Sequence, residues 1–412
     1  MGNRPLEGIR VVEMATFIAA PCTARFLADL GAEVIKVEPP MGDPLRYTAV
    51  NEGRPLDQKE NTSYDLENAG KTCISLNTKS EEGREALEKL LSTADVFICN
   101  WRQSPLKRAG LDWETLHEKY PKLVYGYVSG YGEKGPDKDL PGFDFTAFYA
   151  RGGILGPLRD KNSLPMLTVQ GFGDHQVAMN LAAGVLAALF KAKMTGEGDH
   201  VVVSLFHSAI WDISLMLQAS QYGADSTQYP MERWKLGNPL VLCYETADGQ
   251  WLQIAMPQYD RHYPILMNAM GYPELADDAR YYPQKNLIPN REEFSAWITA
   301  EFKKKTCDEW CKLLDANDLP YAIAQEWDSL LEDKQAWASD CFYEMSYSNG
   351  NKRTLVRPPV LFDQMGLPPY ERGPYLGEQT KDILGELGYS GEAIEEMIKG
   401  GAAIDMDPAL RD

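Results

Sequence analysis

The sequence has no excess of positive charge. Its 412 residues include 41 lysines and arginines against 60 aspartates and glutamates, so the formal net charge is −19. A field of this sign repels DNA, RNA and anionic lipid. We therefore expect no nucleic-acid partner, and any polyanionic ligand would need a local cluster of basic side chains.

Long apolar runs are also missing. No stretch reaches the ~18 consecutive apolar residues that a membrane span needs. Residues 1–14 do not combine a basic segment with an apolar one, as a signal peptide does. These absences predict no membrane association and a cytoplasmic location.

Cysteine and histidine occur without the spacing of a known site. Seven irregularly placed cysteines do not suggest a disulfide framework. Cys307 and Cys311 have no histidine pair at zinc-ligand spacing. The phosphate-binding loop G-x-x-x-x-G-K-[ST] and the G-x-S-x-G elbow of serine hydrolases are absent. We predict no metal and no permanently bound cofactor.

Short apolar runs alternate with helical patterns in the first third of the chain. Strands are expected near residues 9–14, 33–38, 71–77, 95–101 and 122–132, with helices at 20–31 and 81–94. Strands that alternate with helices predict a largely parallel sheet. Near-continuous apolar runs are typical of strands covered on both faces.

The pattern continues to about residue 222 and then changes. Residues 166–170 are predicted as a strand, 174–196 as a long apolar helix and 200–205 as a further strand. A hairpin with its turn at Asp248 and Gly249 follows, and then helices. We predict a large domain over 1–224, a smaller α+β domain over 225–330, and a return to the large domain over 331–412.

Residues 169–180, VQGFGDHQVAMN, are the most informative segment. Gly171 and Gly173 predict a tight turn, and Asp174 follows at the start of a helix. The helix dipole would keep a carboxylate there ionised, and an ionised carboxylate attacks activated acyl groups. An ordinary N-cap is the alternative role for Asp174. Gln176 stands where the dinucleotide fingerprint requires a small residue, which argues against a nicotinamide or flavin enzyme.

Two further groups of residues have more than one interpretation. Basic residues recur where loops should follow strands and could gather around a polyanion, although surface charge is the simpler reading; they are Lys36, Arg46, Lys71, Lys79, Arg102, Lys107 and Arg108. Aromatic residues are dense over 225–265, where they either form a core or line an apolar pocket.

In order along the chain, several segments resemble class III CoA transferases, the family that contains formyl-CoA transferase. They are LEGIRVVEMATFIAAP, LGAEVIKVEPPMGDPLR, ADVFICNW, SGYGEKGPDKDLPGFDFTA, GDHQ, TGEGDHVVVSL and PYLGEQTKDILGELG. The resemblance implies a Rossmann-like large domain, a smaller α+β domain and an intertwined homodimer. It also implies a coenzyme A thioester as substrate, not as a bound cofactor.

The resemblance assigns roles residue by residue. Asp174 matches the catalytic aspartate, which would form aspartyl anhydride and aspartyl-CoA thioester intermediates, and Asp144 matches a second carboxylate near the site. Positions that contact CoA fall on Ala19, Leu76, Lys79, Asn100 and Arg108. Backbone N–H groups at the Gly171–Gly173 turn are the expected oxyanion donors.

The chain departs from formyl-CoA transferase at three places. Ile18 and Pro39 replace a glutamine and an arginine, and the glycine-rich mobile loop of the small domain has no evident counterpart. Phe143 occupies the position of the catalytic histidine in the racemases of the family, and a phenyl ring cannot abstract a proton. This favours a transferase over the alternatives, an acyl-CoA racemase or a non-catalytic CoA-binding protein.

Within the family, residues 42–56 and 141–153 are most similar to transferases that serve (R)-2-hydroxyacyl-CoA dehydratases in amino-acid-fermenting anaerobes. The likeness implies a donor such as cinnamoyl-CoA and an acceptor such as (R)-phenyllactate or another aryl-lactate. (R)-2-Hydroxyisocaproate is the alternative acceptor. Phe143, Phe145, Phe148 and Tyr149 cluster near the expected site and favour an apolar acyl group.

Overall fold

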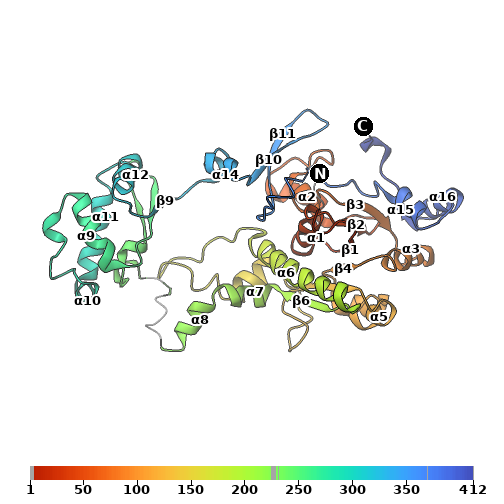
Figure 1. Cartoon of the computed structure of the whole chain (residues 1–412), viewed down its shortest axis with the longest axis horizontal. Helices are drawn as coiled ribbons and strands as arrows, with labels where there is room; N and C mark the ends of the chain where they lie inside the picture. The colour runs from red at the N-terminus through yellow and green to blue at the C-terminus, as the bar shows by residue number, and fades with distance from the viewer. Residues whose placement is uncertain (1–3, 224–228, 231, 369, 412) are drawn as a thin grey trace. The chain divides into compact units, whose positions relative to one another are not determined.

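The computed structural model describes residues 4–223, 229–230, 232–368 and 370–411. The chain forms two compact units (Figure 1). The first, here called the sheet unit, comprises Met1–Leu155, Leu167–Ser214 and Lys334–Asp412. The second, the small unit, comprises Gly156–Met166 and Leu215–Asp333. The predicted boundaries placed residues 156–166 in the large domain, but their contacts group them with the small unit.

The sheet unit is built on one seven-stranded sheet in the order β12-β3-β2-β1-β4-β5-β6. Every neighbouring pair from β3 to β6 is parallel, and β12 runs antiparallel to β3. The mainly parallel sheet predicted from the sequence is therefore confirmed. Its strands are β1 (Arg10–Met14), β2 (Glu33–Glu38), β3 (Thr72–Leu76), β4 (Val96–Cys99), β5 (Val124–Ser129), β6 (His200–Ser204) and β12 (Ala403–Ile404).

Alternate residues of each strand face two separate cores. Val11 packs with α1 (Ala19–Asp29) and α6 (Phe172–Thr195), whereas Val12 packs with α3 (Glu81–Leu91) on the opposite face. Both valines are fully buried. Burial on two faces explains why these strands read as continuous apolar runs.

The remaining helices of the sheet unit are shorter. They are α2 (Thr62–Asn68), α4 (Gln103–Ala109), α5 (Trp113–Lys119), α7 (Leu205–Asp212), α14 (Lys334–Ala338), α15 (Thr380–Glu386) and α16 (Gly391–Lys399), with the 3₁₀ segment η1 (Pro44–Glu52) and the π-helical segment η2 (Asp144–Ala150). A hairpin of β10 (Phe342–Ser346) and β11 (Lys352–Val356) precedes α15.

Helix α6 is long and apolar enough, by composition, to cross a membrane. In the sheet unit it packs against α1 and strand β5. Val177, Leu181 and Val185 are fully buried in that contact. A core helix of a large α/β sheet has the same composition, and the buried face accounts for it.

One predicted strand is wrong. Residues 166–170 contain no ladder and run as irregular chain into α6. The backbone of Val169 bonds instead to a side chain: its N–H donates to the Tyr149 hydroxyl, which donates to the Val169 carbonyl. An extended, apolar segment can thus satisfy its backbone without joining a sheet.

The small unit is an α+β assembly with its own core. Strands β7 (Cys243–Glu245), β8 (Trp251–Ile254) and β9 (Tyr321–Ile323) form an antiparallel sheet, which confirms the predicted hairpin. Its helices include α8 (Ser214–Ser220), α9 (Tyr259–Met270), α10 (Gln284–Leu287), α11 (Arg291–Phe302), α12 (Cys307–Ala316) and α13 (Trp327–Leu331).

The aromatic residues predicted over 225–265 form mainly core. Tyr244 stacks on Phe302 at 4.6 Å between ring centroids, and Tyr259 stacks on Tyr263 at 4.9 Å. All four rings are buried within the small unit. Packing, not an acyl pocket, explains these four.

A buried ion network crosses the middle of the large sheet. Lys36 on β2 lies 2.7 Å from a Glu13 carboxylate oxygen and 3.0 Å from Asp43, and Lys71 lies 2.6 Å from the other Glu13 oxygen. These four side chains are fully buried. Burial would raise the pKa of Glu13, but the charges of Lys36 and Lys71 outweigh it and lower that pKa.

Replacing Lys36 with methionine tests this network. The variant keeps the volume but leaves the buried Asp43 without its cation and Glu13 with Lys71 alone, so we expect the free energy of unfolding to fall by about 3–5 kcal/mol. Urea-induced unfolding measures the change. The matched control is Lys191→Met, which breaks an exposed pair with Asp199; an equal loss in the control would contradict the role of burial.

Candidate active site

The strand order reverses direction between β1 and β4, and a cavity lies at that point. From β1 the chain builds outward to β2 and β3 on one side and to β4, β5 and β6 on the other. Ligands of open α/β sheets bind beyond the carboxyl ends of the strands at such a switch point. A cavity of about 230 Å³ opens there, lined by residues that follow β1, β4, β5 and β6, among them Thr16, Asn100, Gly130 and Leu205.

Three hydrogen bonds with two side chains fix the loop after β1. The Asn100 amide accepts from the Thr16 N–H at 3.1 Å and donates to the Thr16 carbonyl at 2.8 Å. The Asp43 carboxylate accepts from the Phe17 N–H at 3.1 Å. Phe17 adopts a left-handed conformation with φ of 63°, which is uncommon for a bulky residue. The polar clamps hold this conformation at the cavity wall.

Helix α6 begins at the same cavity. Gly171 precedes the helix with φ of 81°, and it makes no side-chain cap. A Cβ on Gly173 would lie 2.3 Å from the Phe148 ring and 2.4 Å from an Asp144 oxygen, so this position has room only for glycine. Asp174 sits in the first turn and lines the cavity. The N-cap alternative for Asp174 is therefore wrong.

Asp144 on η2 provides the polar partner of this helix start. Its carboxylate accepts from the Gly173 N–H at 3.2 Å, and it is buried. Burial raises the pKa of Asp144 to about 6, although the backbone hydrogen bonds from Gly171 and Gly173 lower it. These contacts also correct an expectation, because the Gly173 N–H predicted as an oxyanion donor is already bonded to Asp144.

The electrostatic surroundings of Asp174 are the opposite of those expected. Burial, followed by the negative charges of Asp144 and Glu67, raises its pKa to about 7, and only the charge of His175 lowers it. The predicted stabilisation of the ionised form by the helix start is outweighed. A carboxyl group that titrates near neutral pH is a stronger nucleophile when ionised than an ordinary one, and perturbed groups of this kind gather at functional sites.

The structure brings together some of the residues predicted to contact CoA. Ala19 and Asn100 line the cavity with Asp174. Leu76 is buried at the end of β3, where it pairs with Ala403. Lys79 and Arg108 are exposed and lie outside the cavity lining.

Two other cations line the cavity. Arg102, which follows β4, is one of the predicted basic loop residues. Lys138, in the long segment after β5, is not among those predictions. Lys138 lies within the DKDLPG stretch, and a lysine in a loop after a parallel strand was the signal that could have identified it.

The cavity also has an apolar wall. Ile18, Leu140 and Phe143 line it, and the Phe143 ring meets the Phe17 ring edge to face at 6.2 Å. Of the other predicted aromatic residues, Phe148 and Tyr149 are buried, and Phe145 is exposed without lining the cavity. Pro39, which replaces an arginine of formyl-CoA transferase, is exposed and does not line the cavity.

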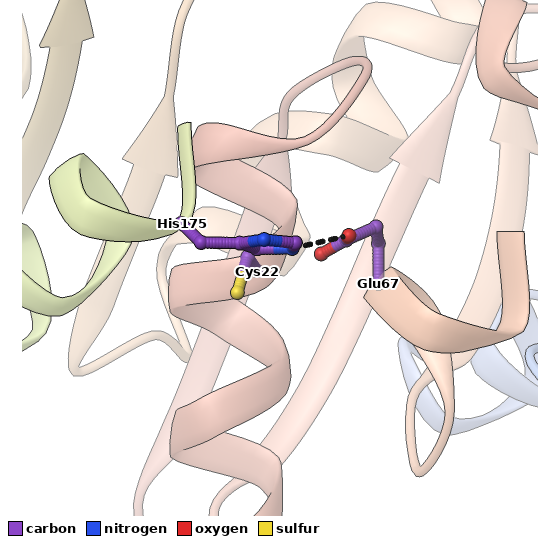
Figure 2. A group of neighbouring side chains, drawn as sticks. All are labelled: Cys22, Glu67 and His175. Carbon is purple, nitrogen blue, oxygen red and sulfur yellow. Dashed lines mark hydrogen bonds and ion pairs between the residues drawn. The ribbon is translucent and has the colours of Figure 1, made fainter. Parts of the chain in front are cut away.

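Cys22, Glu67 and His175 are the one set of metal-ligand side chains that cluster among the described residues (Figure 2). Their donor atoms lie within 4.8 Å of one another. The His175 Nε2 and Glu67 Oε1 atoms are only 2.9 Å apart. Two zinc ligands at 2.0–2.1 Å and a tetrahedral angle are about 3.3 Å apart. The contact is therefore a hydrogen bond, and the cluster as arranged does not fit a metal.

A larger cavity of about 370 Å³ lies elsewhere in the sheet unit. Its lining includes Lys71, Tyr347, Arg372 and Glu378. Arg372 and Glu378 pair with each other at 2.8 Å. This cavity lacks a helix-start carboxylate, so size alone does not make it the better candidate.

Together, the fold and the cavity define a Rossmann-like α/β enzyme that presents a carboxylate of raised pKa to an apolar wall. The chain belongs to CoA-transferase family III, whose sequence profile matches residues 6–380. It is thus a CoA transferase, and a CoA thioester is its substrate.

Relatives of known activity extend over nearly the whole chain. The chain is 52% identical to the cinnamoyl-CoA:phenyllactate CoA-transferase of Clostridium sporogenes over 95% of its own length and 96% of the relative. It is 41% identical to the (R)-2-hydroxy-4-methylpentanoate CoA-transferase of Clostridioides difficile, over 94% and 97% of the two chains. A solved CaiB/BaiF family protein from Brucella suis matches with a TM-score of 0.78 at 27% identity, over 93% of this chain and 100% of that one.

Replacing Asp174 with asparagine should stabilise the fold in a pH-dependent way. The folded-state pKa of about 7 lies above the ordinary value of about 3.9, so the wild type loses stability as pH rises from about 4 to 7. The variant does not titrate there. We expect it to gain about 1–3 kcal/mol at pH 8, a range reduced for the partial exposure of the group, and nothing at pH 4.

Thermal unfolding at the two pH values measures this difference. The exposed Glu197→Gln serves as the control for removal of a negative charge near the other end of α6. A variant that is equally stable or less stable than the wild type at pH 8 would contradict the raised pKa.

Proposed function

We propose that the protein transfers CoA from an acyl-CoA donor such as cinnamoyl-CoA to a 2-hydroxy acid, with (R)-phenyllactate or another aryl-lactate as the preferred acceptor. The observation that carries the proposal is the meeting of Asp174 with the Phe17–Phe143 pair in one cavity. The 52% identity to a transferase with these substrates supports it.

The Asp174 carboxylate attacks the thioester carbonyl of the donor. The carbon–sulfur bond breaks, and a mixed aspartyl–acyl anhydride and CoA thiolate form. The thiolate then attacks the aspartyl carbonyl, which gives an aspartyl-CoA thioester and releases the donor acid as a carboxylate. Covalent catalysis of this kind divides one difficult exchange into easier steps.

The acceptor completes the cycle in reverse order. Its carboxylate attacks the aspartyl-CoA carbonyl and expels the thiolate, which attacks the acceptor carbonyl of the new anhydride. The products are the 2-hydroxyacyl-CoA and the free Asp174 carboxylate. No proton, electron or metal ion is consumed, so the pocket needs only to hold the reactants in line and exclude water.

Each part of the cavity has a role in this scheme. Arg102 and Lys138 provide positive charge against the global net charge and would contact the phosphates of CoA. Asn100 and Ala19 lie beside Asp174 and would contact the pantetheine arm. Lys79 and Arg108 remain proposed contacts for the outer part of CoA, since both are exposed.

Asp144 is proposed as a supporting carboxylate. It anchors the first turn of α6 through Gly173, and its charge adds to the effect of burial in raising the pKa of Asp174. Among the described residues that line the cavity there is no histidine, and the family resemblance matches Phe143 to the catalytic histidine of the racemases. Proton abstraction from the α-carbon therefore has no matching pair of bases here.

The chemistry of donor and acceptor suggests a partner reaction. Cinnamoyl-CoA is phenyllactyl-CoA minus one water molecule. A 2-hydroxyacyl-CoA dehydratase would therefore consume the product and regenerate the donor, as expected in amino-acid fermentation by an anaerobe. All seven cysteines are free thiols, which is typical of the reducing cytoplasm.

We also infer an intertwined homodimer. Large apolar side chains on α6 and α7 are exposed in the single chain: Phe190 is 72%, Met194 is 73% and Trp211 is 70% exposed. Large apolar side chains that are exposed in one chain are expected where a partner covers them. Light scattering of the purified protein should give twice the 46.2 kDa mass of the chain, and a folded, active monomer would contradict the inference.

Loss of the nucleophile should abolish transfer. We expect Asp174→Ala to lower kcat at least 10³-fold while CoA still binds, because no other group replaces the covalent step. Hydroxylamine should trap the activated aspartate of the wild type as a hydroxamate that mass spectrometry places at residue 174. The exposed Asp199→Ala is the matched control; near-normal transfer by the Asp174 variant would refute the assignment.

The acceptor preference is tested by comparing kcat/KM with cinnamoyl-CoA as donor. Phenyllactate and indolelactate should lead, 2-hydroxyisocaproate should be roughly tenfold slower, and oxalate should be slowest because a small dianion gains nothing from an apolar wall. Phe143→Ala should reduce the preference for phenyllactate over 2-hydroxyisocaproate roughly 3–10-fold. A lead for oxalate would overturn the argument from the pocket, whereas a lead for 2-hydroxyisocaproate would change only the acceptor.

A further inference from the structure

His175 follows Asp174 in the first turn of α6 and points away from the cavity, toward α2. Its Nε2 atom lies 2.9 Å from the Glu67 Oε1 atom (Figure 2). The Glu67 side chain is 3% exposed, whereas that of His175 is 45% exposed. A buried carboxylate thus holds a half-exposed imidazole directly beside the nucleophile.

The contact between the two side chains affects the pKa of His175. Burial lowers the pKa of His175, but the hydrogen bond and charge of Glu67, with the charges of Asp174 and Asp144, outweigh it and raise the pKa. The nearby Cys22 remains a neutral thiol, because burial and the Glu67 charge raise its pKa well above the ordinary value. The contact with Glu67 therefore favours the protonated His175 ring.

The titratable side chains around the start of α6 come from four elements. Asp174 belongs to α6, Asp144 to η2 and Glu67 to α2, and the Cys22 thiol lies on α1. Lys71 is nearby, but its ammonium group lies 2.6 Å from Glu13. His175 is the positive charge that acts directly on Asp174, where it opposes Asp144 and Glu67.

We propose that His175 is a positioning residue for CoA transfer: held by Glu67, its ring fixes the first turn of α6 against α2, and its positive charge favours the ionised form of Asp174. The inference rests on the proposed role of Asp174 as nucleophile. Glu67 holds the His175 ring, and its own charge opposes that of His175 at Asp174.

The geometry explains how the two residues transmit their effect. The backbone N–H of His175 donates to the Gly171 carbonyl at 2.9 Å, so His175 belongs to the same helical turn as Asp174. A Cβ on Gly171 would lie 3.3 Å from Ile18 and 3.7 Å from the His175 ring, so the three groups pack closely. A shift of the imidazole would displace the turn and the cavity wall together.

The test is the pH dependence of kcat/KM between pH 5.5 and 8.5. Wild-type activity should rise with pH through the titration of Asp174, since only the ionised form attacks. His175→Gln keeps a hydrogen-bond donor for Glu67 but removes the charge, so the midpoint should move to higher pH by roughly 0.5–1 unit. The same substitution at the exposed His207 should leave the midpoint unchanged.

A second variant separates charge from packing. In the double variant His175→Gln with Glu67→Gln, an amide pair replaces the ion pair, and both charges near Asp174 are lost. The midpoint should return toward the wild-type value, whereas a purely structural contact would leave the single and double variants alike. NMR titration of the wild-type His175 ring should give a pKa above the ordinary ~6.5, and Glu67→Gln should lower it.

Several results would overturn the inference. They are an unchanged or lower midpoint in a folded His175→Gln variant, a His175 pKa at or below the ordinary value, or stoichiometric zinc in the purified protein. If instead Asp174→Ala retains transfer, the proposed nucleophile is wrong. The two failures are therefore distinguishable.

Discussion

The buried Lys36 ammonium is the interaction on which the site depends. It joins two carboxylates, Glu13 on β1 and Asp43 after β2, and also donates to the Ala15 carbonyl at 3.1 Å. Asp43 in turn accepts from the Phe17 N–H, so a single cation fixes the end of β1 and the residue that forms the cavity wall. Buried ions are costly unless they are fully paired. Their use here is understandable because the loop they hold carries a left-handed aromatic residue, which a purely apolar core would leave free to relax.

At Asp174, the proposed nucleophile, the charges are not balanced in this way. Around Lys36 the charges are matched, whereas around Asp174 they are not: Asp144 and Glu67 add negative charge, and His175 alone compensates. The buried charges around Lys36, on β1 and β2, are therefore balanced, whereas those around Asp174 at the cavity are not. The network around Lys36 stabilises the fold. The charges around Asp174 give its carboxyl group a pKa near neutral pH, where acid–base and nucleophilic groups are most effective.

The sequence predicted the sheet well because its strands are apolar runs that are buried on both faces, and this pattern depends only on neighbouring residues. It also located Asp174, since the glycines before it report a sharp turn. It failed where tertiary contacts decide. Residues 166–170 look like a strand, but a Tyr149 hydroxyl satisfies Val169 in place of a ladder. The pKa of Asp174 was predicted in the wrong direction, because Glu67 lies 107 residues earlier in the sequence and nothing local marks it.

The proposed substrate preference follows from the polar and apolar groups that line the cavity. A polar site for a small acid would surround the reacting carboxylates with hydrogen-bond donors, yet the Gly173 N–H is already bonded to Asp144 and the opposite wall is phenyl and alkyl. An acceptor therefore binds mainly through apolar contact. Each Å² of apolar surface that it buries contributes about 25 cal/mol, which favours an aryl over a short acyl group. The charged groups then serve the step that all acceptors share, the exchange of one thioester for another. In the proposed mechanism, different residues therefore serve chemistry and specificity: the α6 turn carries the exchange, and Phe17 and Phe143 determine the acceptor.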